Sequence, residues 1–294
     1  MTVHNLGSIN IDLVFRVPHI PAPGETLLSK GMTRGLGGKG ANTSIALAEA
    51  GASVIHYGAV GSDGKWAIEE LTARGIDCSH VGVLEMPSGQ AIIQVDDEGE
   101  NAITLLKGAN WGFSTDLLDD LFETAKSGDW LVLQNETAHV ALAAKRAKTL
   151  GLMVAYAAAP FDAEATRDVL PFVDCLALNE IEAAQLSEQT GSEISDMPVP
   201  MILVTRGENG ATLYRNGKAP VSKAAMKVDQ VRDTTGAGDT FFGFFLGSLS
   251  RNLSHEDCLR VASAAAALSV TKIGAAAAIP SISEVEAILS KTSF

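Results

Sequence analysis

Cysteine is scarce in this chain, and its spacing argues against two structural classes. The 294 residues include three cysteines, Cys78, Cys175 and Cys258. They are odd in number, widely separated and form no C-x-x-C pair, so neither a zinc site nor a disulfide framework is predicted. Free thiols of this kind are typical of proteins in a reducing compartment.

Positive charge is also in short supply. The sequence has 22 Lys and Arg against 35 Asp and Glu, which gives a formal net charge of −13. A surface of this sign is unsuited to nucleic acid, so we expect no nucleic-acid partner. An acidic protein that binds phosphates has to use backbone N–H groups, a few basic side chains and a metal ion.

Long apolar runs are missing as well. The longest, over 262–270, is alanine-rich and too short to cross a membrane. The first residues lack the basic segment and following apolar run of a signal peptide. We therefore expect a soluble, cytoplasmic protein with no membrane partner.

The most informative stretch is Asp233-Thr-Thr-Gly-Ala-Gly-Asp239, which a dense apolar run follows. The run suits a buried helix, and the unpaired N–H groups at its start favour anions such as phosphate. Glycine lets the backbone approach a ligand closely. Asp239 beside such a turn makes sense as a base that takes a proton from an attacking hydroxyl. An ordinary capped helix after a tight turn would show the same residues, so this stretch alone leaves both readings open.

A second glycine-rich stretch covers 35–42 and precedes a predicted helix over 43–50. It matches G-x-G-x-x-G, so a dinucleotide-binding turn is an alternative. Against this, a good strand already precedes it in the chain, and the next strand, over 52–60, lacks an acid at its end to bind a ribose. Gly40 follows Lys39, which also excludes a Walker A loop. We interpret the stretch as a glycine turn that presents Lys39 and Asn42 beside a helix start.

Apolar strands alternate with helices through the second half of the chain. Strands are predicted at 130–134, 153–158, 173–178 and 201–205, with helices at 138–150, 163–169 and 180–186 between them. This order predicts an α/β fold, a three-layer α/β/α sandwich with a mostly parallel central sheet. We expect one domain over 1–294, with strands from about 11–36 and 88–106 forming a small β-sheet lid.

The two glycine stretches, at 37–42 and 233–239, resemble the two signatures of the PfkB-type carbohydrate kinases, and of their ribokinase-like branch most closely. Weaker matches follow in family order: GSINID at 7–12, PGET at 23–26, GAN at 108–110, NEIE at 179–182 and TRG at 205–207. Together they cover nearly the whole chain, and they displace the dinucleotide alternative.

The resemblance implies an ATP-dependent sugar kinase that phosphorylates a hydroxymethyl group, with ribose as the first candidate. It implies that Asp239 is the catalytic base and that Gly236, Ala237 and Gly238 form an anion hole. The residues that the resemblance assigns to the sugar are Asn10, Asp12, Gly38, Lys39, Asn42 and Glu136. Asp, Asn and Lys side chains supply both the donors and the acceptors that several hydroxyls need.

The resemblance also implies sites for the nucleotide and for two cations. ATP is expected against Asn179, Thr205, Gly207, Gly210 and Gly238, with Glu182 organising Mg²⁺ through water. A monovalent cation, potassium, is a further possibility. Its expected ligand groups belong to Asp233, Thr235, Ser269, Lys272 and Gly274, although the alanines at 275–278 stand where ribokinases usually carry polar residues.

One departure from the family pattern, and the range of substrates that the fold accepts, leave alternatives open. Ala157 and Ala158 replace an Asn-Pro pair of ribokinases, so a non-catalytic sugar-binding sensor is one rival. Another is a kinase of the same fold that acts on a nucleoside, fructose or ketodeoxygluconate. Few aromatic residues in the lid stretches favour a free sugar over a nucleoside. Exposed lid edges also predict a homodimer through the lid.

Overall fold

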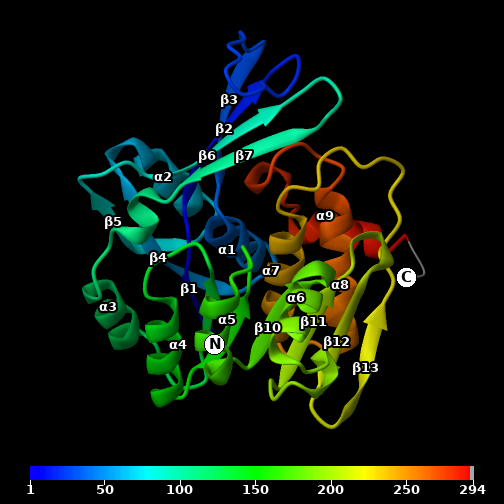
Figure 1. The fold of residues 1–294 in the computed structure, drawn as a ribbon. Helices are drawn as coiled ribbons and strands as arrows, with labels where there is room; N and C mark the ends of the chain where they lie inside the picture. The colour runs from blue at the N-terminus through cyan, green and yellow to red at the C-terminus, as the bar shows by residue number, and fades with distance from the viewer. Residues whose placement is uncertain (292–294) are drawn as a thin grey trace.

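The computed structural model describes residues 1–291 and builds them around two β-sheets (Figure 1). The large sheet has nine strands in the order β13-β12-β11-β10-β9-β8-β1-β4-β5. Its strands are β1 (Thr2–Leu6), β4 (Ser53–Gly61), β5 (Asp77–Leu84), β8 (Trp130–Gln134), β9 (Met153–Ala157), β10 (Cys175–Asn179), β11 (Met201–Thr205), β12 (Ala211–Arg215) and β13 (Lys218–Lys223). The strands from β5 to β11 pair in parallel, and β12 and β13 are antiparallel.

Helices cover both faces of this sheet, because its strands are apolar on both sides. Within β8, Trp130 and Val132 join one buried cluster, and Leu131 and Leu133 join the other. The first cluster packs under α1 (Lys39–Glu49), α2 (Lys65–Ala73), α7 (Ala237–Ser250), α8 (His255–Ser269) and α9 (Ile282–Leu289). The second packs under α3 (Asp116–Thr124), α4 (Val140–Thr149), α5 (Ala163–Val169) and α6 (Glu180–Thr190). The predicted three-layer α/β/α fold is confirmed.

The small sheet projects from one end of the main body (Figure 1). Its strand order is β3-β2-β6-β7, with β2 (Asn10–Arg16), β3 (Gly31–Gly37), β6 (Gly89–Val95) and β7 (Asn101–Leu106). The hairpin of β6 and β7 closes where the Asp96 side chain accepts hydrogen bonds from the N–H groups of Glu98 and Glu100. These strands match the segments predicted for the lid, and we call them the lid sheet.

Several boundaries differ from the sequence prediction. The helix expected over 43–50 begins at Lys39, because Gly38 takes φ 92 and turns the chain directly from β3 into α1. Strand β5 and helix α3 were not predicted. Short 3₁₀ turns complete the chain at Ser62–Gly64, Gly108–Trp111, Leu170–Phe172, Ile194–Asp196, Gly207–Asn209 and Ala276–Ala278.

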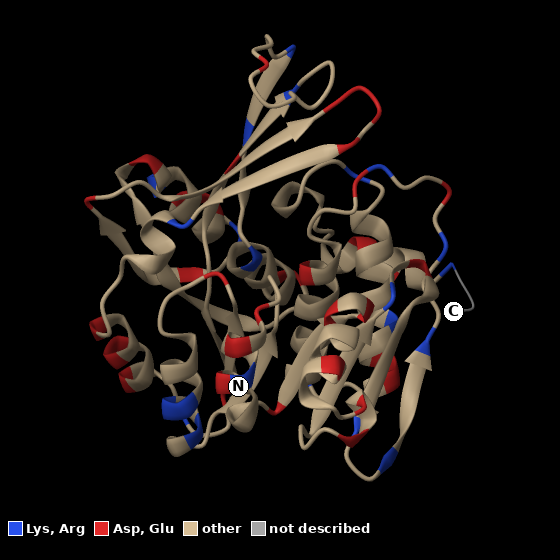
Figure 2. Cartoon of the chain, viewed as in Figure 1, with Lys and Arg blue, Asp and Glu red and all other residues tan. Residues whose placement is uncertain are grey.

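Acidic residues occur on many elements of the chain, for example on α3, on α6 and at the β6–β7 turn (Figure 2). None of the helices within residues 1–291 is long and apolar enough to cross a membrane.

Candidate active site

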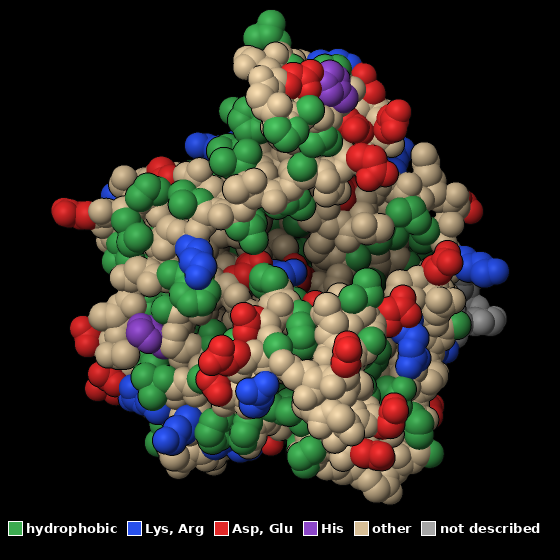
Figure 3. Space-filling model, viewed as in Figure 1, with side chains coloured by type: hydrophobic (Ala, Val, Ile, Leu, Met, Phe, Trp, Pro, Cys, Tyr) green, Lys and Arg blue, Asp and Glu red, His purple; other side chains and the backbone are tan. Residues whose placement is uncertain are grey.

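The candidate residues gather where parallel strands end beneath the lid sheet. Strands β1, β8, β10 and β11 run in the same direction, so the segments after Leu6, Gln134, Asn179 and Thr205 emerge at one edge of the large sheet. Figure 3 shows the molecule hollowed between this edge and the lid sheet, with acidic and basic side chains at the bottom of the hollow. The lid sheet also brings β2 and the turn into α1 to this place.

The start of α7 presents unpaired backbone donors. Gly236 precedes the helix with φ 73, a conformation that suits glycine, and no side chain caps the helix. The N–H of Ala237 donates to the carbonyl of Thr234 at 3.2 Å. Among residues 1–291, the N–H groups of Gly238 and Asp239 have no acceptor, and a Cβ added at Gly238 would meet no atom within 4 Å. The turn therefore offers open space and free donors to an anion.

Asp239 lies in the first turn of α7, half-buried, and a side chain from α1 holds its carboxylate. Asn42 Nδ2 donates to Asp239 Oδ2 at 2.9 Å. The buried Oδ1 of Asn42 has no partner within the described chain, so it is left to accept from a ligand. The Asp239 carboxylate raises the pKa of Lys39 against the opposing effect of burial, and Glu136 and Glu182 act in the same direction as Asp239. Lys39 thus stays charged amid three carboxylates.

Glu136 holds the turn before α1. Its Oε2 accepts from Ser8 Oγ at 2.5 Å and from the N–H of Lys39 at 3.0 Å. Ser8 Oγ in turn accepts from the N–H of Gly40 at 3.2 Å. The carboxylate therefore stabilises the start of α1 and ties it to the segment after β1. Ser8 was not singled out from the sequence, because its partners lie far away in the chain.

Asp12 and Asn10 lie two residues apart on β2, so both side chains are on one face of the lid sheet. Burial raises the pKa of Asp12 to about 7, and the nearby charge of Glu136 adds to this effect. A Cβ on Gly37 would lie 2.1 Å from Asp12 Oδ2, so glycine is needed for the carboxylate to fit there. On Gly38, a Cβ would lie 2.9 Å from the backbone nitrogen of Asn10.

Asn179 and Glu182 form a capping box at the start of α6. Asn179 Oδ1 accepts from the N–H of Ile181 and of Glu182, and Glu182 Oε2 accepts from the N–H of Asn179 at 2.8 Å. Burial raises the pKa of Glu182 and the charge of Asp239 adds to this, while Asn179 and Lys39 oppose it. Two carboxylates that repel each other in this way fit a divalent cation, the charge that would relieve the repulsion.

The expected cation would keep much of its water. No group of three or more His, Cys, Asp and Glu side chains in residues 1–291 is arranged to hold a metal ion. Mg²⁺ commonly binds through one or two carboxylates, substrate phosphates and several waters, so this sparse donor set fits magnesium.

The turn after β11 contains the other residues assigned to the nucleotide. Thr205 Oγ1 donates to the carbonyl of Leu178 at 3.4 Å, which ties the end of β11 to β10. Gly207 takes φ 50 and has open space where a Cβ would be. Gly210 takes φ 89, and its Cβ would meet the carbonyl oxygen of Lys223 at 2.0 Å. Gly210 is therefore required by packing, whereas Gly207 leaves room for a ligand.

The residues assigned to a monovalent cation lie at one loop junction beside α7. Asp233 accepts from the N–H groups of Thr235 and Gly274, each at 2.9 Å. Burial alone would raise the pKa of Asp233, but the hydrogen bonds from Thr235 and Gly274 lower it. The carbonyl of the buried Ser269 accepts from the N–H of Lys272 at 3.0 Å. Both oxygens of Asp233 are thus engaged in holding this junction together.

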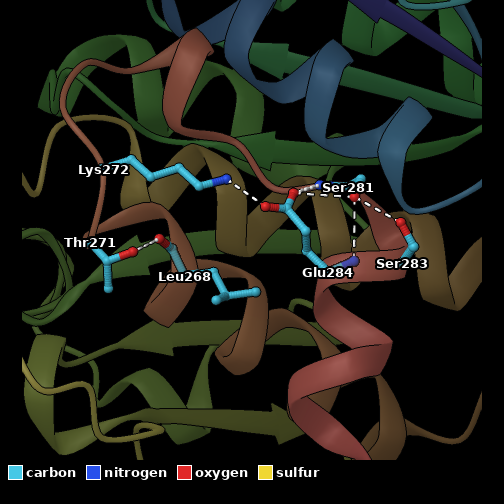
Figure 4. A network of polar contacts seen from close by, with 6 residues as sticks. All are labelled: Leu268, Thr271, Lys272, Ser281, Ser283 and Glu284. Atoms are coloured by element: carbon cyan, nitrogen blue, oxygen red, sulfur yellow. Dashed lines mark hydrogen bonds and ion pairs between the residues drawn. The ribbon is translucent and has the colours of Figure 1, made fainter.

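The side chain of Lys272 points away from that junction. Figure 4 shows it reaching Glu284 on α9, with Nζ 2.9 Å from Oε1. The other oxygen of Glu284 accepts from the N–H and hydroxyl of Ser281, the residue that caps α9. Lys272 would therefore contribute to a cation site through its backbone alone.

Comparison with known proteins identifies the family. The sequence profile described as pfkB family carbohydrate kinase matches residues 2–282. The chain belongs to the pfkB family of carbohydrate kinases. It is 36% identical over 298 residues to a ribokinase of Haemophilus influenzae, and the match covers 96% of each chain. A deoxyribokinase of Salmonella typhi is 31% identical over 305 residues, with 99% of each chain covered.

Solved structures of the family agree with this fold. An Arabidopsis thaliana ribokinase complexed with ribose and ATP superposes with a TM-score of 0.86 and 30% identity, over 98% of each chain. This pfkB kinase is therefore a phosphotransferase with an alcohol group as acceptor, and the expected ribokinase-like fold is confirmed.

Beneath the site, this kinase contains a buried polar network that was not predicted from the sequence. Asn5 Nδ2 donates to the Gly40 carbonyl at 2.8 Å and to Ser44 Oγ at 2.7 Å. His56 contacts Ser44 Oγ through Nδ1 at 2.8 Å and the Gly7 carbonyl through Nε2 at 3.1 Å. Burial lowers the pKa of His56 to about 4, although its bond to Gly7 opposes the shift. The network supports the start of α1 at Gly40 and the segment after β1 at Gly7.

Proposed function

We propose that this pfkB kinase is an ATP-dependent ribokinase that phosphorylates the hydroxymethyl group of ribose. The observation that carries the proposal is the arrangement at the start of α7, where Asp239 lies beside the free N–H groups of the Gly-Ala-Gly turn and Asn42 fixes its carboxylate. A base and an anion-binding turn at one point are what phosphoryl transfer to a hydroxyl requires. The ribokinase relatives supply the choice of sugar.

In the proposed step, the oxygen of the sugar hydroxyl attacks the γ-phosphorus of ATP. The bond between that phosphorus and the leaving oxygen of ADP breaks, and the hydroxyl proton passes to the Asp239 carboxylate. Gly236, Ala237 and Gly238 hold the negative charge on the transferred group, and Lys39 faces it with a positive charge. Magnesium held near Glu182 would neutralise phosphate charge when it is bound. Asn42 keeps the base pointed at the hydroxyl.

The sugar would lie between the lid sheet and the turn into α1. Lys39 and Asp12 offer opposite charges there, and the unpartnered Oδ1 of Asn42 offers an acceptor. Several fixed groups of both kinds can satisfy a compact polyol in one orientation. The proposed set of contacts is Asn10, Asp12, Gly38, Lys39, Asn42 and Glu136.

ATP would lie over the ends of β10 and β11. The open space at Gly207 and Gly238 supports contact with the nucleotide, and Asn179 and Thr205 lie on the same edge of the sheet. Gly210 shapes the turn because its position is crowded by backbone. We place the whole chain in one functional unit, in the cytoplasm, where ATP and free sugar meet.

A potassium ion is a further part of the proposal. Asp233 is charged and half-buried beside the anion-binding turn, and the backbone of Thr235, Ser269, Lys272 and Gly274 lies at the same junction. A cation there would add positive charge beside the anion-binding turn before α7. It would also hold the loops at this junction in one conformation. Turnover measured in potassium and in a bulky organic cation would test this directly.

We also propose a homodimer that forms through the lid sheet. Strands β3 and β7 are its edges, and such edges pair readily with another chain. Large apolar side chains on the lid are exposed, namely Met32, Ile92, Ile103, Leu105 and Leu106. A second copy would cover an apolar surface that water otherwise wets. Sedimentation of the purified protein would give the oligomeric state.

The proposed activity is tested by ADP release with ATP, magnesium and a panel of ribose, 2-deoxyribose, fructose, ketodeoxygluconate and nucleosides. Asp239→Asn serves as the inactive variant, and Glu180→Gln, an exposed acid at the start of α6, serves as the matched control. Rapid turnover of ribose with a 5-phosphate product would support the proposal. Turnover of another substrate alone would contradict the choice of ribose, and sugar binding without turnover would favour a sensor.

A further inference from the structure

Two buried asparagine side chains meet at the base of the lid sheet, where β2 begins. Asn10 begins β2, and Asn110 lies in the 3₁₀ turn Gly108–Trp111. Asn110 Nδ2 donates to Asn10 Oδ1 at 2.7 Å. The two residues are 7% and 2% exposed, so this bond is nearly sealed from water. An amide pair in such a place is costly unless its polar atoms are satisfied.

The direction of the hydrogen bonds in this pair is fixed by the backbone. The N–H of Ile9 lies 2.9 Å from Asn110 Oδ1, and a backbone N–H can only donate. The oxygen of the Asn110 amide must therefore face Ile9, and its amino group must face Asn10. That places the Asn10 oxygen inward, so the Asn10 amino group is the end left for a ligand. Among the described residues, Asn10 Nδ2 has no acceptor.

The surrounding backbone is shaped around the pair. A Cβ on Gly89 of β6 would lie 2.1 Å from Asn110 Nδ2 and 2.3 Å from Asn10 Oδ1. The carbonyl of Asn110 accepts from the N–H of Ala138 at 3.1 Å, which anchors the turn to the segment before α4. Asn110 is therefore held from both its backbone and its side chain, and it cannot turn its amide round without losing the bond to Ile9.

We propose that Asn110 is a positioning residue that fixes Asn10 as a hydrogen-bond donor toward the sugar. This inference rests on the proposed function, since it requires that Asn10 faces the sugar. Asn10 then presents an amino group and Asp12, two residues along the same strand face, presents a carboxylate. Asn10 accordingly binds a sugar oxygen that accepts, and Asn110 reaches the substrate only through Asn10.

A double-mutant cycle tests this relation. Asn110→Ala frees the Asn10 amide to rotate, so we expect the KM for sugar to rise about 3- to 10-fold, the range of one hydrogen bond, with kcat and the KM for ATP near wild type. Asn10→Ala should raise the KM for sugar about 10-fold. The double variant should match Asn10→Ala alone, because Asn110 has no other route to the substrate.

A second variant reverses the direction of the hydrogen bond between residue 110 and Asn10. Asn110→Asp keeps an acceptor for Ile9 but turns the other end into an acceptor, so the Asn10 amide must rotate and present its oxygen to the sugar. The KM for sugar should then rise more than in Asn110→Ala, and this excess should vanish when Asn10→Ala is added. Asn101→Ala, an exposed asparagine on β7, is the matched control and should leave the KM unchanged.

The outcomes separate the two proposals. If wild-type protein turns over a sugar and the KM effects of Asn10→Ala and Asn110→Ala multiply, Asn110 acts independently of Asn10 and this inference is overturned. The same holds if Asn110→Ala lowers kcat and leaves the KM for sugar unchanged. If wild-type protein turns over no sugar in the panel, the proposed function fails, and this inference fails with it.

Discussion

Asp12 gives the sharpest test of the site, because it links stability, pH and sugar binding. Burial, with a contribution from Glu136, raises its pKa from 3.8 to about 7. Between these values the native state holds a proton that the unfolded chain releases, so the carboxyl destabilises the native state progressively as pH rises. A carboxyl shifted this far costs the native state roughly 4 kcal/mol once it is ionised, and about 2 kcal/mol after a discount for solvent access.

Asp12→Asn removes this cost. The free energy of unfolding of the variant, relative to wild type, should therefore increase by about 2 kcal/mol between roughly pH 4 and pH 7. The measurement is urea unfolding of both proteins at each pH without substrate. The variant should be more stable and yet bind sugar poorly, because the amide keeps one accepting oxygen where the carboxylate has two.

Sugar binding offers an independent readout of the same carboxyl. Hydroxyl groups that donate to the Asp12 carboxylate favour its ionised form and lower its pKa. Wild-type protein should thus release protons on binding sugar near pH 7, seen as a binding enthalpy that depends on the buffer, and Asp12→Asn should not. A stability difference that stays constant with pH, together with no proton release in wild type, would refute this reasoning.

Three further predictions follow from the other buried and charged groups. Asp239→Asn should lower kcat by roughly 10²- to 10⁴-fold with little change in sugar affinity, as measured by ADP release and calorimetry, and full turnover would contradict its role as base. Glu182→Gln should raise the magnesium concentration needed for half-maximal rate several-fold, whereas the exposed Glu180→Gln should not. His56, whose pKa burial lowers to about 4, stays neutral in the native state, so wild type should lose stability as pH falls from about 6.5 to 4. His56→Gln should not show this loss in urea unfolding, and identical profiles for the two proteins would show that His56 protonates freely.

The sequence predicted most of the fold because the relevant signals are local. Apolar strands such as 130–134 are buried on both faces, and short apolar runs that alternate with helices are typical of a parallel sheet. The lid hairpin was predicted because Asp96 and Gly99 mark a turn in the chain itself. Strand β5 was missed because 77–84 is mostly polar or half-exposed, so it lacks the apolar run of the inner strands.

The residue types of the candidate site could be predicted from the sequence, but the hydrogen bonds that join its residues could not. Motifs suggested Asp239, Lys39 and Asn42, and the structure brings these three together at the start of α7. The bonds that hold the site residues in place join residues about 100 or more positions apart, such as Asn10 with Asn110 and Ser8 with Glu136. Patterns of neighbouring residues in the sequence do not predict such distant pairs. The residues Asn5, Ser44 and His56 lie closer together in the chain, and their network was missed because each residue alone looks like an ordinary polar position.

The negative charges of the site explain why these hydrogen bonds are needed. Asp12, Glu136, Glu182 and Asp239 are four carboxylates close enough to perturb one another or Lys39. Burial is the largest cause of the raised pKa values of Asp12 and Glu182, and repulsion from a neighbouring carboxylate adds to it. In the absence of ligands this repulsion destabilises the native state, and only fixed donors such as the Asn42 amide and the N–H of Lys39 hold the carboxylates in place. A sugar that donates hydroxyl protons and a divalent cation would each relieve part of it. Binding of one should therefore strengthen binding of the other, because both act on the same set of negative charges.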